Sequence, residues 1–362
     1  MTRLNEPYYK QHAVISGKTP CWHNVKTDPR ISVHGLYNYA VEPIFKRMPD
    51  DIAKSVSERV AGLYTNTAGG RIRFKTDSRY LALRCMIPKI TQRPLMSLLN
   101  SAGFDVYFME NGVETYWYSF YPPIDLSDTH DECFEGMVWF ENTAEREITV
   151  YMPLYNDVAD VFIGIAPGAS LEAHRLYTHS APILYYGSSI TQGASVSRPG
   201  MAYQAQLSRR FDADFINLGF ASGACGEESI INYMATLDFD IFVSDYDYNA
   251  PNAAHLRNTH SKLYRAIRNT HPNTPYVMLS KPILNRMSNT QENRERRGIV
   301  ENTYREALDS GDKNVWFIDG FTLFKGIQPG DICSDGVHPN DLGAYYMANA
   351  IGDVFDKIYH ER

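Results

Sequence analysis

The sequence predicts an all-β domain followed by an α/β domain with a parallel sheet. First, apolar and polar residues alternate in short runs up to about residue 170, which is the period of a half-buried strand. Second, apolar strands alternate with helical stretches from about residue 180 onward. Third, a length of 362 residues suits two domains better than one. We therefore expect one domain at 1–175 and the other at 176–362.

The first domain is predicted to be an antiparallel β-sandwich of the jelly-roll type. Residues 71–76 and 80–87 show the alternation most clearly. Asn111-Gly112 lies between two aromatic-rich runs and favours the type I′ turn of a hairpin, because both residues tolerate a positive φ. Short strands separated by turn signals are typical of sandwiches. Further strands are expected at 133–140, 146–155 and 161–167.

The second domain is predicted to be a doubly wound parallel sheet. Its strands are nearly continuous apolar runs, which is typical of burial on both faces of a sheet. They are expected at 182–187, 214–219, 239–246, 275–280 and 314–319. Helices are expected at 252–271, 292–311 and 340–359. The segment 167–182 is the expected seam between the domains.

Composition and charge exclude several classes of partner. The formal net charge is −7 and no run of Lys and Arg stands out, so we expect no nucleic-acid partner. No window reaches the roughly 18 uninterrupted apolar residues of a membrane helix, so we expect no membrane partner. The polar start of the chain shows no secretory leader, which leads us to expect a cytoplasmic protein. A homo-oligomer is left open.

Polar residues gather where the strands of the second domain end. Ligands of an open parallel sheet bind beyond the carboxyl ends of its strands. Four clusters therefore fall on one edge of the predicted sheet: GSSITQG (187–193), GFASGACGE (219–227), DYDYNAP (245–251) and SDGVHPN (334–340).

In type and order these clusters resemble the four short blocks of the SGNH/GDSL hydrolase family. That resemblance implies a flavodoxin-like fold with a five-stranded parallel sheet and assigns Ser189 as the nucleophile, with Asp335 and His338 from the last block. Ser188 stands where the family usually has Asp. In the first half, the runs 34–37 and 101–107 resemble the β-sandwich domain that precedes some SGNH esterases.

The residue types fit acyl transfer. A serine hydroxyl becomes a good nucleophile when a base takes its proton, and the imidazole of His338 titrates near neutral pH. Asp335, placed three residues before His338, can accept the other imidazole N–H and fix the orientation of the ring. The alternative is that Ser189 merely caps a helix.

The resemblance also assigns an oxyanion hole. Its donors would be the backbone N–H of Ser189, a backbone N–H of the glycine block and the side chain of Asn249. The glycine-block donor is assigned to Gly223, with its neighbour Ser222 as the alternative, and Asn249 could instead be an ordinary loop residue. Asp245 and Asp247 are interpreted as solvated loop carboxylates, and we expect no metal and no cofactor.

The leading hypothesis is a serine esterase that removes O-acetyl groups from acetylated plant glycans or oligosaccharides of the mannan or xylan type. The resemblance implies the acetyl group and the sugar, because several two-domain SGNH proteins are carbohydrate esterases. Two alternatives stay open. The same site could serve an acyltransferase or a short-chain acyl esterase on a non-carbohydrate substrate, or the chain could be a non-catalytic glycan-binding protein.

Overall fold

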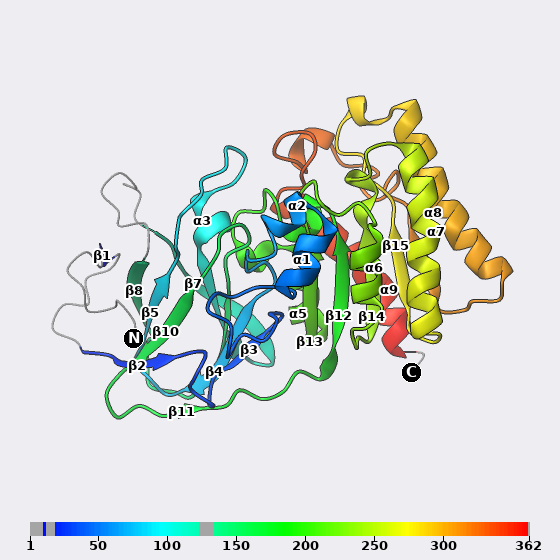
Figure 1. Cartoon of the computed structure of the whole chain (residues 1–362). Helices are drawn as coiled ribbons and strands as arrows, with labels where there is room; N and C mark the ends of the chain where they lie inside the picture. The colour runs from blue at the N-terminus through cyan, green and yellow to red at the C-terminus, as the bar shows by residue number, and fades with distance from the viewer. Residues whose placement is uncertain (1–9, 12–18, 123–132, 361–362) are drawn as a thin grey trace. The chain divides into compact units, whose positions relative to one another are not determined.

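A computed structural model describes residues 10–11, 19–122 and 133–360 of the chain (Figure 1). The chain divides into two compact units. The sandwich unit holds the chain up to Arg47, then Thr65–Leu176 and Arg198–Gly200. The α/β unit holds Met48–Tyr64, Tyr177–Ser197 and the chain from Met201 onward. Each unit therefore includes one short segment from the other half of the sequence, Met48–Tyr64 in the α/β unit and Arg198–Gly200 in the sandwich unit. The change of sequence pattern, in contrast, predicts a single boundary near residue 175.

The sandwich unit contains two β-sheets. One has the order β1-β8-β5-β10-β2 and the other β11-β4-β9-β6-β7, with β3 beside β4. All pairs are antiparallel except the short pair β1–β8. The eight longest of these strands follow the jelly-roll order, β8-β5-β10-β2 in one sheet and β4-β9-β6-β7 in the other. The strands are β1 (Lys10–Gln11), β2 (Cys21–Asn24), β3 (Ser32–His34), β4 (Arg71–Thr76), β5 (Tyr80–Met86), β6 (Phe104–Glu110), β7 (Val113–Phe120), β8 (Cys133–Trp139), β9 (Arg146–Tyr151), β10 (Asp160–Ile165) and β11 (Leu171–Glu172).

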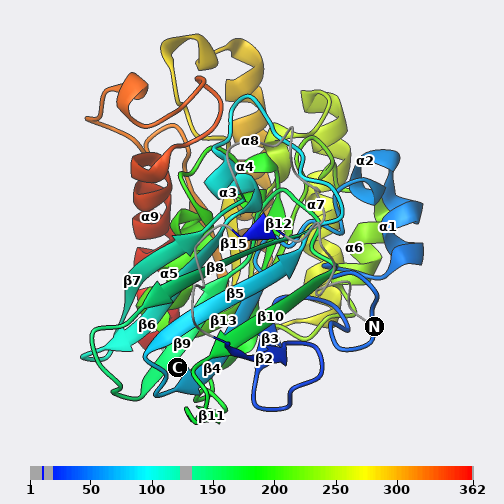
Figure 2. The ribbon, with the colours of Figure 1, turned by 90° about the vertical axis from the view of Figure 1, so that its left-hand side faces the viewer.

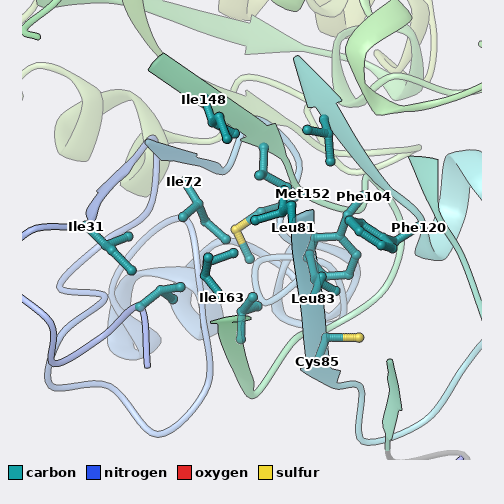
Figure 3. Close-up of a cluster of buried hydrophobic side chains, with 14 of the residues drawn as sticks. Ile31, Ile72, Leu81, Leu83, Cys85, Phe104, Phe120, Ile148, Met152 and Ile163 are labelled. Carbon is teal, nitrogen blue, oxygen red and sulfur yellow. The ribbon is translucent and has the colours of Figure 1, made fainter. Parts of the chain in front are cut away.

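Inward-facing side chains of both sheets form the core of the sandwich unit (Figure 3). Leu81 and Leu83 of β5 are fully buried, as are Ile72 of β4 and Ile148 of β9. Each such side chain stabilises the fold by roughly 1.5–3 kcal/mol through burial. The predicted alternation of apolar and polar residues is confirmed, because alternate residues of β4, β5, β6, β9 and β10 supply this core.

The predicted hairpin is also confirmed. Strands β6 and β7 pair from Phe104↔Phe120 to Glu110↔Val113. Asn111 and Gly112 connect them with φ angles of 52° and 82°. These are the left-handed conformations that a type I′ turn requires of both central residues.

The α/β unit is built on a parallel sheet of order β13-β12-β14-β15-β16. Its strands are β12 (His179–Gly187), β13 (Ala213–Gly219), β14 (Ile241–Asp245), β15 (Tyr276–Leu279) and β16 (Val315–Ile318). The strand order is the flavodoxin-like one, which confirms the predicted fold class. Its topological switch point lies between β12 and β14, where such sheets bind ligands.

Helices cover both faces of this sheet (Figure 2). Helix α5 contacts α9, while α7 contacts both α6 and α8. The three predicted long helices are confirmed as α7, α8 and α9. The helices of this unit are α1 (Asp50–Val56), α2 (Glu58–Ala61), α4 (Ser189–Gln192), α5 (Tyr203–Phe211), α6 (Glu228–Met234), α7 (Ala253–Thr270), α8 (Gln291–Asp309) and α9 (Asp341–His360), whereas α3 (Leu98–Ala102) belongs to the sandwich unit.

Helices α1 and α2 differ from the prediction of strands throughout the first half of the chain. Both are short, and Ser57 caps α2 by accepting a hydrogen bond from the backbone N–H of Val60. Val60 is fully buried within the α/β unit. In the part of the chain that the structure describes, no helix combines the length and the apolar character that crossing a membrane requires.

Candidate active site

The turn after β12 places Ser189 at the start of a helix. The Ser188 side chain accepts a hydrogen bond of 3.1 Å from the backbone N–H of Ile190 and so caps α4. Gly193 ends α4 with a left-handed φ of 104°, a conformation that glycine adopts without strain. Capping is therefore the function of Ser188, and Ser189 is the first helical residue.

Ser189, His338 and Asp335 form a continuous hydrogen-bonded chain. Ser189 Oγ lies 2.8 Å from His338 Nε2, although the two residues are 149 positions apart. On the other side of the ring, His338 Nδ1 lies 2.8 Å from Asp335 Oδ2. All three residues belong to the α/β unit, and the structure brings them together as the sequence predicts.

The loop before α9 holds Asp335 in its orientation. Asp335 Oδ1 accepts hydrogen bonds from the backbone N–H groups of Val337 (2.9 Å) and His338 (2.8 Å). Burial acts to raise the pKa of Asp335, but the hydrogen bonds from the His338 ring and from these N–H groups outweigh it and lower the pKa. Asp335 therefore stays ionised at neutral pH and accepts a hydrogen bond from the imidazole ring.

A buried carboxyl group lies beneath the turn that carries Ser189. Asp245, at the end of β14, is 4% exposed. Its Oδ1 accepts a hydrogen bond of 3.1 Å from the backbone N–H of Ser188 and another from the Thr191 hydroxyl. A Cβ on Gly187 would overlap this carboxyl, so glycine is required where β12 passes β14. Asp245 thus holds the backbone before Ser189 and the side chain of Thr191 after it.

The sequence reasoning was wrong about Asp245 and Asp247. Both were expected to be solvated, but both are buried, with Asp247 only 1% exposed. Asp247 Oδ2 accepts the backbone N–H of Lys281, and Arg296 donates to the Asp247 carbonyl. Single-residue context does not show burial, because the covering side chains come from distant segments. Among the described residues, no group of three His, Cys, Asp or Glu residues is arranged to hold a metal ion.

Most backbone N–H groups of the glycine block already have partners. The N–H of Gly223 donates to the Phe220 carbonyl at 2.8 Å and closes a β-turn, so Gly223 is not available as an oxyanion donor. This corrects the choice of Gly223 over Ser222. Between residues 220 and 226, only the N–H of Ser222 lacks an acceptor among the described residues. The other six N–H groups of this stretch donate hydrogen bonds, and they belong to Phe220, Ala221, Gly223, Ala224, Cys225 and Gly226.

Asn249 is tied to the same block. It follows the short 3-10 turn Tyr246–Tyr248, and its Nδ2 donates a hydrogen bond of 2.8 Å to the Phe220 carbonyl. An amide has two N–H donors, so the second remains for a ligand. The Phe220 carbonyl thus joins the asparagine and glycine blocks, and the N–H of Phe220 donates to the carbonyl of Gly187, the first residue of the serine block.

Arg59 contributes to this region, although the sequence analysis did not identify it as a site residue. Its Nε donates a hydrogen bond of 2.7 Å to the carbonyl of Ala221 in the glycine block. Arg59 lies on α2, which the structure places in the α/β unit. The only available signal was Ser57 followed by the helical run 58–61, which departs from the strand pattern around it.

The buried position of Asp245 predicts a pH-dependent stability. Burial raises the pKa of Asp245 to about 7, with the charge of Asp247 adding to the effect and the bonds from Thr191 and Ser188 opposing it. The unfolded chain loses this proton near pH 4. Between these values only the folded protein retains it, so wild-type stability falls as the pH rises from about 4 to 7.

Asp245→Asn should remove this dependence, because the amide keeps the acceptor for Ser188 and does not titrate. At pH 8 we expect its free energy of unfolding to exceed that of wild type by about 1 kcal/mol or more, which raises the melting temperature by several degrees. The difference should be smaller at pH 4.5. Thermal unfolding at both pH values measures this difference. Asp309→Asn, at an exposed position, is the control. Parallel pH profiles for wild type and Asp245→Asn would contradict the prediction.

Two family models match the chain. One, described as the GDSL-like lipase/acylhydrolase family, matches residues 180–356. The other, described as the N-terminus of SGNH-hydrolase-type esterases, matches residues 21–171. A search of the curated proteins found no match.

Solved structures of similar fold cover nearly the whole chain. A Bacteroides ovatus protein described as a GDSL-like lipase is 26% identical with a TM-score of 0.84, over 94% of this chain and 98% of that one. A salicylyl-acyltransferase of a tetracycline biosynthetic pathway is 20% identical with a TM-score of 0.72, over 91% and 95%. An acetyl xylan esterase from Butyrivibrio proteoclasticus is 10% identical with a TM-score of 0.59, over 94% and 99%. The two models together identify a carboxylic ester hydrolase whose residues 180–356 form a GDSL-like lipase/acylhydrolase domain, preceded at residues 21–171 by the N-terminal domain of SGNH-hydrolase-type esterases.

Proposed function

We propose that Ser189, His338 and Asp335 are the catalytic triad of a serine esterase. The observation that carries this proposal is the 2.8 Å contact between Ser189 Oγ and His338 Nε2, with the opposite ring nitrogen on Asp335. A nucleophile, a base and a residue that orients the base are the three parts that acyl transfer requires. The switch point of the sheet is also where parallel α/β folds place their ligands.

The reaction follows from this geometry. Ser189 Oγ attacks the ester carbonyl while His338 Nε2 takes its proton, and Asp335 stabilises the resulting imidazolium. The tetrahedral intermediate collapses, the C–O bond to the alcohol breaks, and His338 returns the proton to the leaving oxygen. Water then attacks the acyl-enzyme with His338 again as base, which releases the acid and restores Ser189.

The proposed oxyanion hole consists of the N–H of Ser189, the N–H of Ser222 and the amide of Asn249. Ser222 replaces Gly223 in this role because the Gly223 N–H is occupied by the Phe220 carbonyl. The bond from Asn249 to the same carbonyl orients the amide before substrate binds. Donors fixed in advance stabilise the developing charge without the cost of reorganisation.

The proposed substrates are acetylated plant glycans or oligosaccharides of the mannan or xylan type. Support comes from the fold shared with the acetyl xylan esterase and with a Clostridium thermocellum family two carbohydrate esterase in complex with cellohexaose, which has a TM-score of 0.59 at 12% identity. The fold shared with the salicylyl-acyltransferase favours a second candidate, transfer of the acyl group to an acceptor other than water.

Replacement of Ser189 by Ala should abolish turnover, because no other hydroxyl is proposed to attack the ester. We expect kcat for p-nitrophenyl acetate to fall by about 10³-fold or more, with an unchanged melting temperature. Absorbance of released p-nitrophenol measures the rate. Ser310→Ala is the matched control, because it removes an exposed hydroxyl at the C-terminal end of α8. An alanine variant at Ser189 as active as wild type, or an inactive wild type, would exclude the mechanism.

Asn249→Ala tests the oxyanion hole separately. Loss of one donor to the oxyanion should lower kcat by about 10²- to 10³-fold and change KM little, because the bond strengthens only as charge develops. Steady-state kinetics on the same ester give both constants. Asn258→Ala, at an exposed position on α7, should leave both unchanged. An effect of Asn249→Ala confined to KM would assign the residue to substrate binding instead.

The acyl group and its carrier are tested by product analysis. We expect wild type to release acetate from acetylated manno- or xylo-oligosaccharides, and Ser189→Ala to release none, as measured by an enzymatic acetate assay. Acetylated pectin oligosaccharides complete the panel. If short acyl esters are hydrolysed but no member of the panel is, the proposed glycan substrate is excluded and the proposed esterase activity is retained. Acyl transfer to an added alcohol in preference to water would favour the acyltransferase.

A further inference from the structure

The sandwich unit contains a hollow of about 340 Å³ near one end of its β6–β7 hairpin. Its walls are the hairpin in one sheet and the segment 140–146, which links β8 of the other sheet to β9. Every lining residue belongs to the sandwich unit, and none belongs to the unit that holds Ser189. Its size is at the lower end of the range of about 300–1,000 Å³ that is typical of ligand pockets.

Aromatic rings form the floor of the hollow. Phe108 and Trp117 meet edge to face with ring centroids 5.5 Å apart, and Phe140 lies 5.8 Å from Trp117. Trp117 is the extra residue of a β-bulge, because Val106 pairs with Tyr118 while Tyr107 pairs with Tyr116. Its buried indole Nε1 has no hydrogen-bond partner among the described residues. Bulges of this kind redirect a side chain and are frequent beside binding sites.

Exposed acceptor groups form the rim. Glu110, Glu141, Asn142 and Glu145 line the hollow and are exposed. Glu145 also pairs with Lys75 at 2.8 Å. The rim therefore carries three carboxylates, which accept hydrogen bonds from hydroxyl groups and repel anions.

Arg146 holds the wall in place. Its guanidinium donates to the carbonyl of Ala144, and to both the carbonyl and the side-chain oxygen of Asn142. It also lies 4.5 Å from the centroid of the Phe140 ring. These bonds fix the segment 140–146 from within. The hollow is therefore preformed, and a ligand would bind it without the entropic cost of ordering this segment.

We propose that this hollow is a glycan-binding site that takes a neutral sugar unit. The carbon face of a pyranose would pack on the aromatic floor, and its hydroxyls would donate to the carboxylates of the rim. The negative rim disfavours uronic acids and other anionic sugars. The site goes beyond the esterase reaction, because all its lining residues belong to the sandwich unit and its binding needs no acyl chemistry.

The test is calorimetric titration of the full chain carrying Ser189→Ala, with mannopentaose, xylopentaose and cellopentaose as probes. We expect at least one of them to bind, and the double change Glu110→Ala and Glu141→Ala to weaken that binding at least tenfold. Both side chains are exposed, so the fold should survive the change, and melting temperatures check this. Glu228→Ala, an exposed change in the α/β unit, is the matched control.

Three results would overturn the proposal. The first is that no neutral oligosaccharide binds. The second is that one binds with an affinity that the double change leaves unaltered, which would place binding elsewhere. The third is that trigalacturonate or choline binds in place of the neutral probes. With Ser189 intact, the double change should leave p-nitrophenyl acetate hydrolysis as in wild type. An inactive wild type would exclude the esterase without deciding the sugar site, and the titrations would exclude the sugar site without deciding the esterase.

Discussion

The carboxyl group of Asp245 accepts the backbone N–H of Ser188 and the hydroxyl of Thr191, the residues on either side of the turn that presents Ser189. This contact depends on the parallel pairing of β12 with β14, which sets Gly187 opposite Asp245. It also depends on the missing side chain of Gly187, because any Cβ there would displace the carboxyl. The turn that carries Ser189, the proposed nucleophile, is thus held from beneath by a neighbouring strand.

The remaining parts of the site assemble around this turn through the strand order. Because β12 lies between β13 and β14, the loops that follow these three strands meet at one edge of the sheet. The glycine block follows β13, and Asn249 follows β14. Both are joined to the Phe220 carbonyl, and the N–H of Phe220 bonds back to Gly187. The proposed oxyanion hole and the proposed nucleophile therefore share one hydrogen-bonded framework.

The two units use buried polar groups in different ways. In the α/β unit, Asp245 is buried beneath the turn that carries Ser189, and burial raises its pKa to about 7. In the sandwich unit, Arg146 lies over the ring of Phe140 and fixes the segment 140–146 of the hollow. The carboxylates of Glu110 and Glu141 in the same hollow are exposed to solvent. The first arrangement suits catalysis, which needs fixed geometry. The second suits reversible binding of a polar ligand, which needs accessible acceptors on a rigid surface.

The sequence by itself determined the elements that depend on local pattern. Alternation identified the strands of the sandwich, Asn111-Gly112 identified the hairpin, and the ends of the parallel strands identified the four polar clusters. It also predicted the pairing of Asp335 with His338, because residues three positions apart in a loop can contact each other without help from the rest of the fold.

Only the tertiary structure decided which groups are buried and which are already bonded. It buried Asp245, placed α1 and α2 in the α/β unit, brought Arg59 to the glycine block and left Ser222 rather than Gly223 with an open N–H. The physical reason is that burial and hydrogen bonding depend on neighbours distant in the chain. Ser188 and Asp245 are 57 residues apart, and Arg59 and Ala221 are 162 apart.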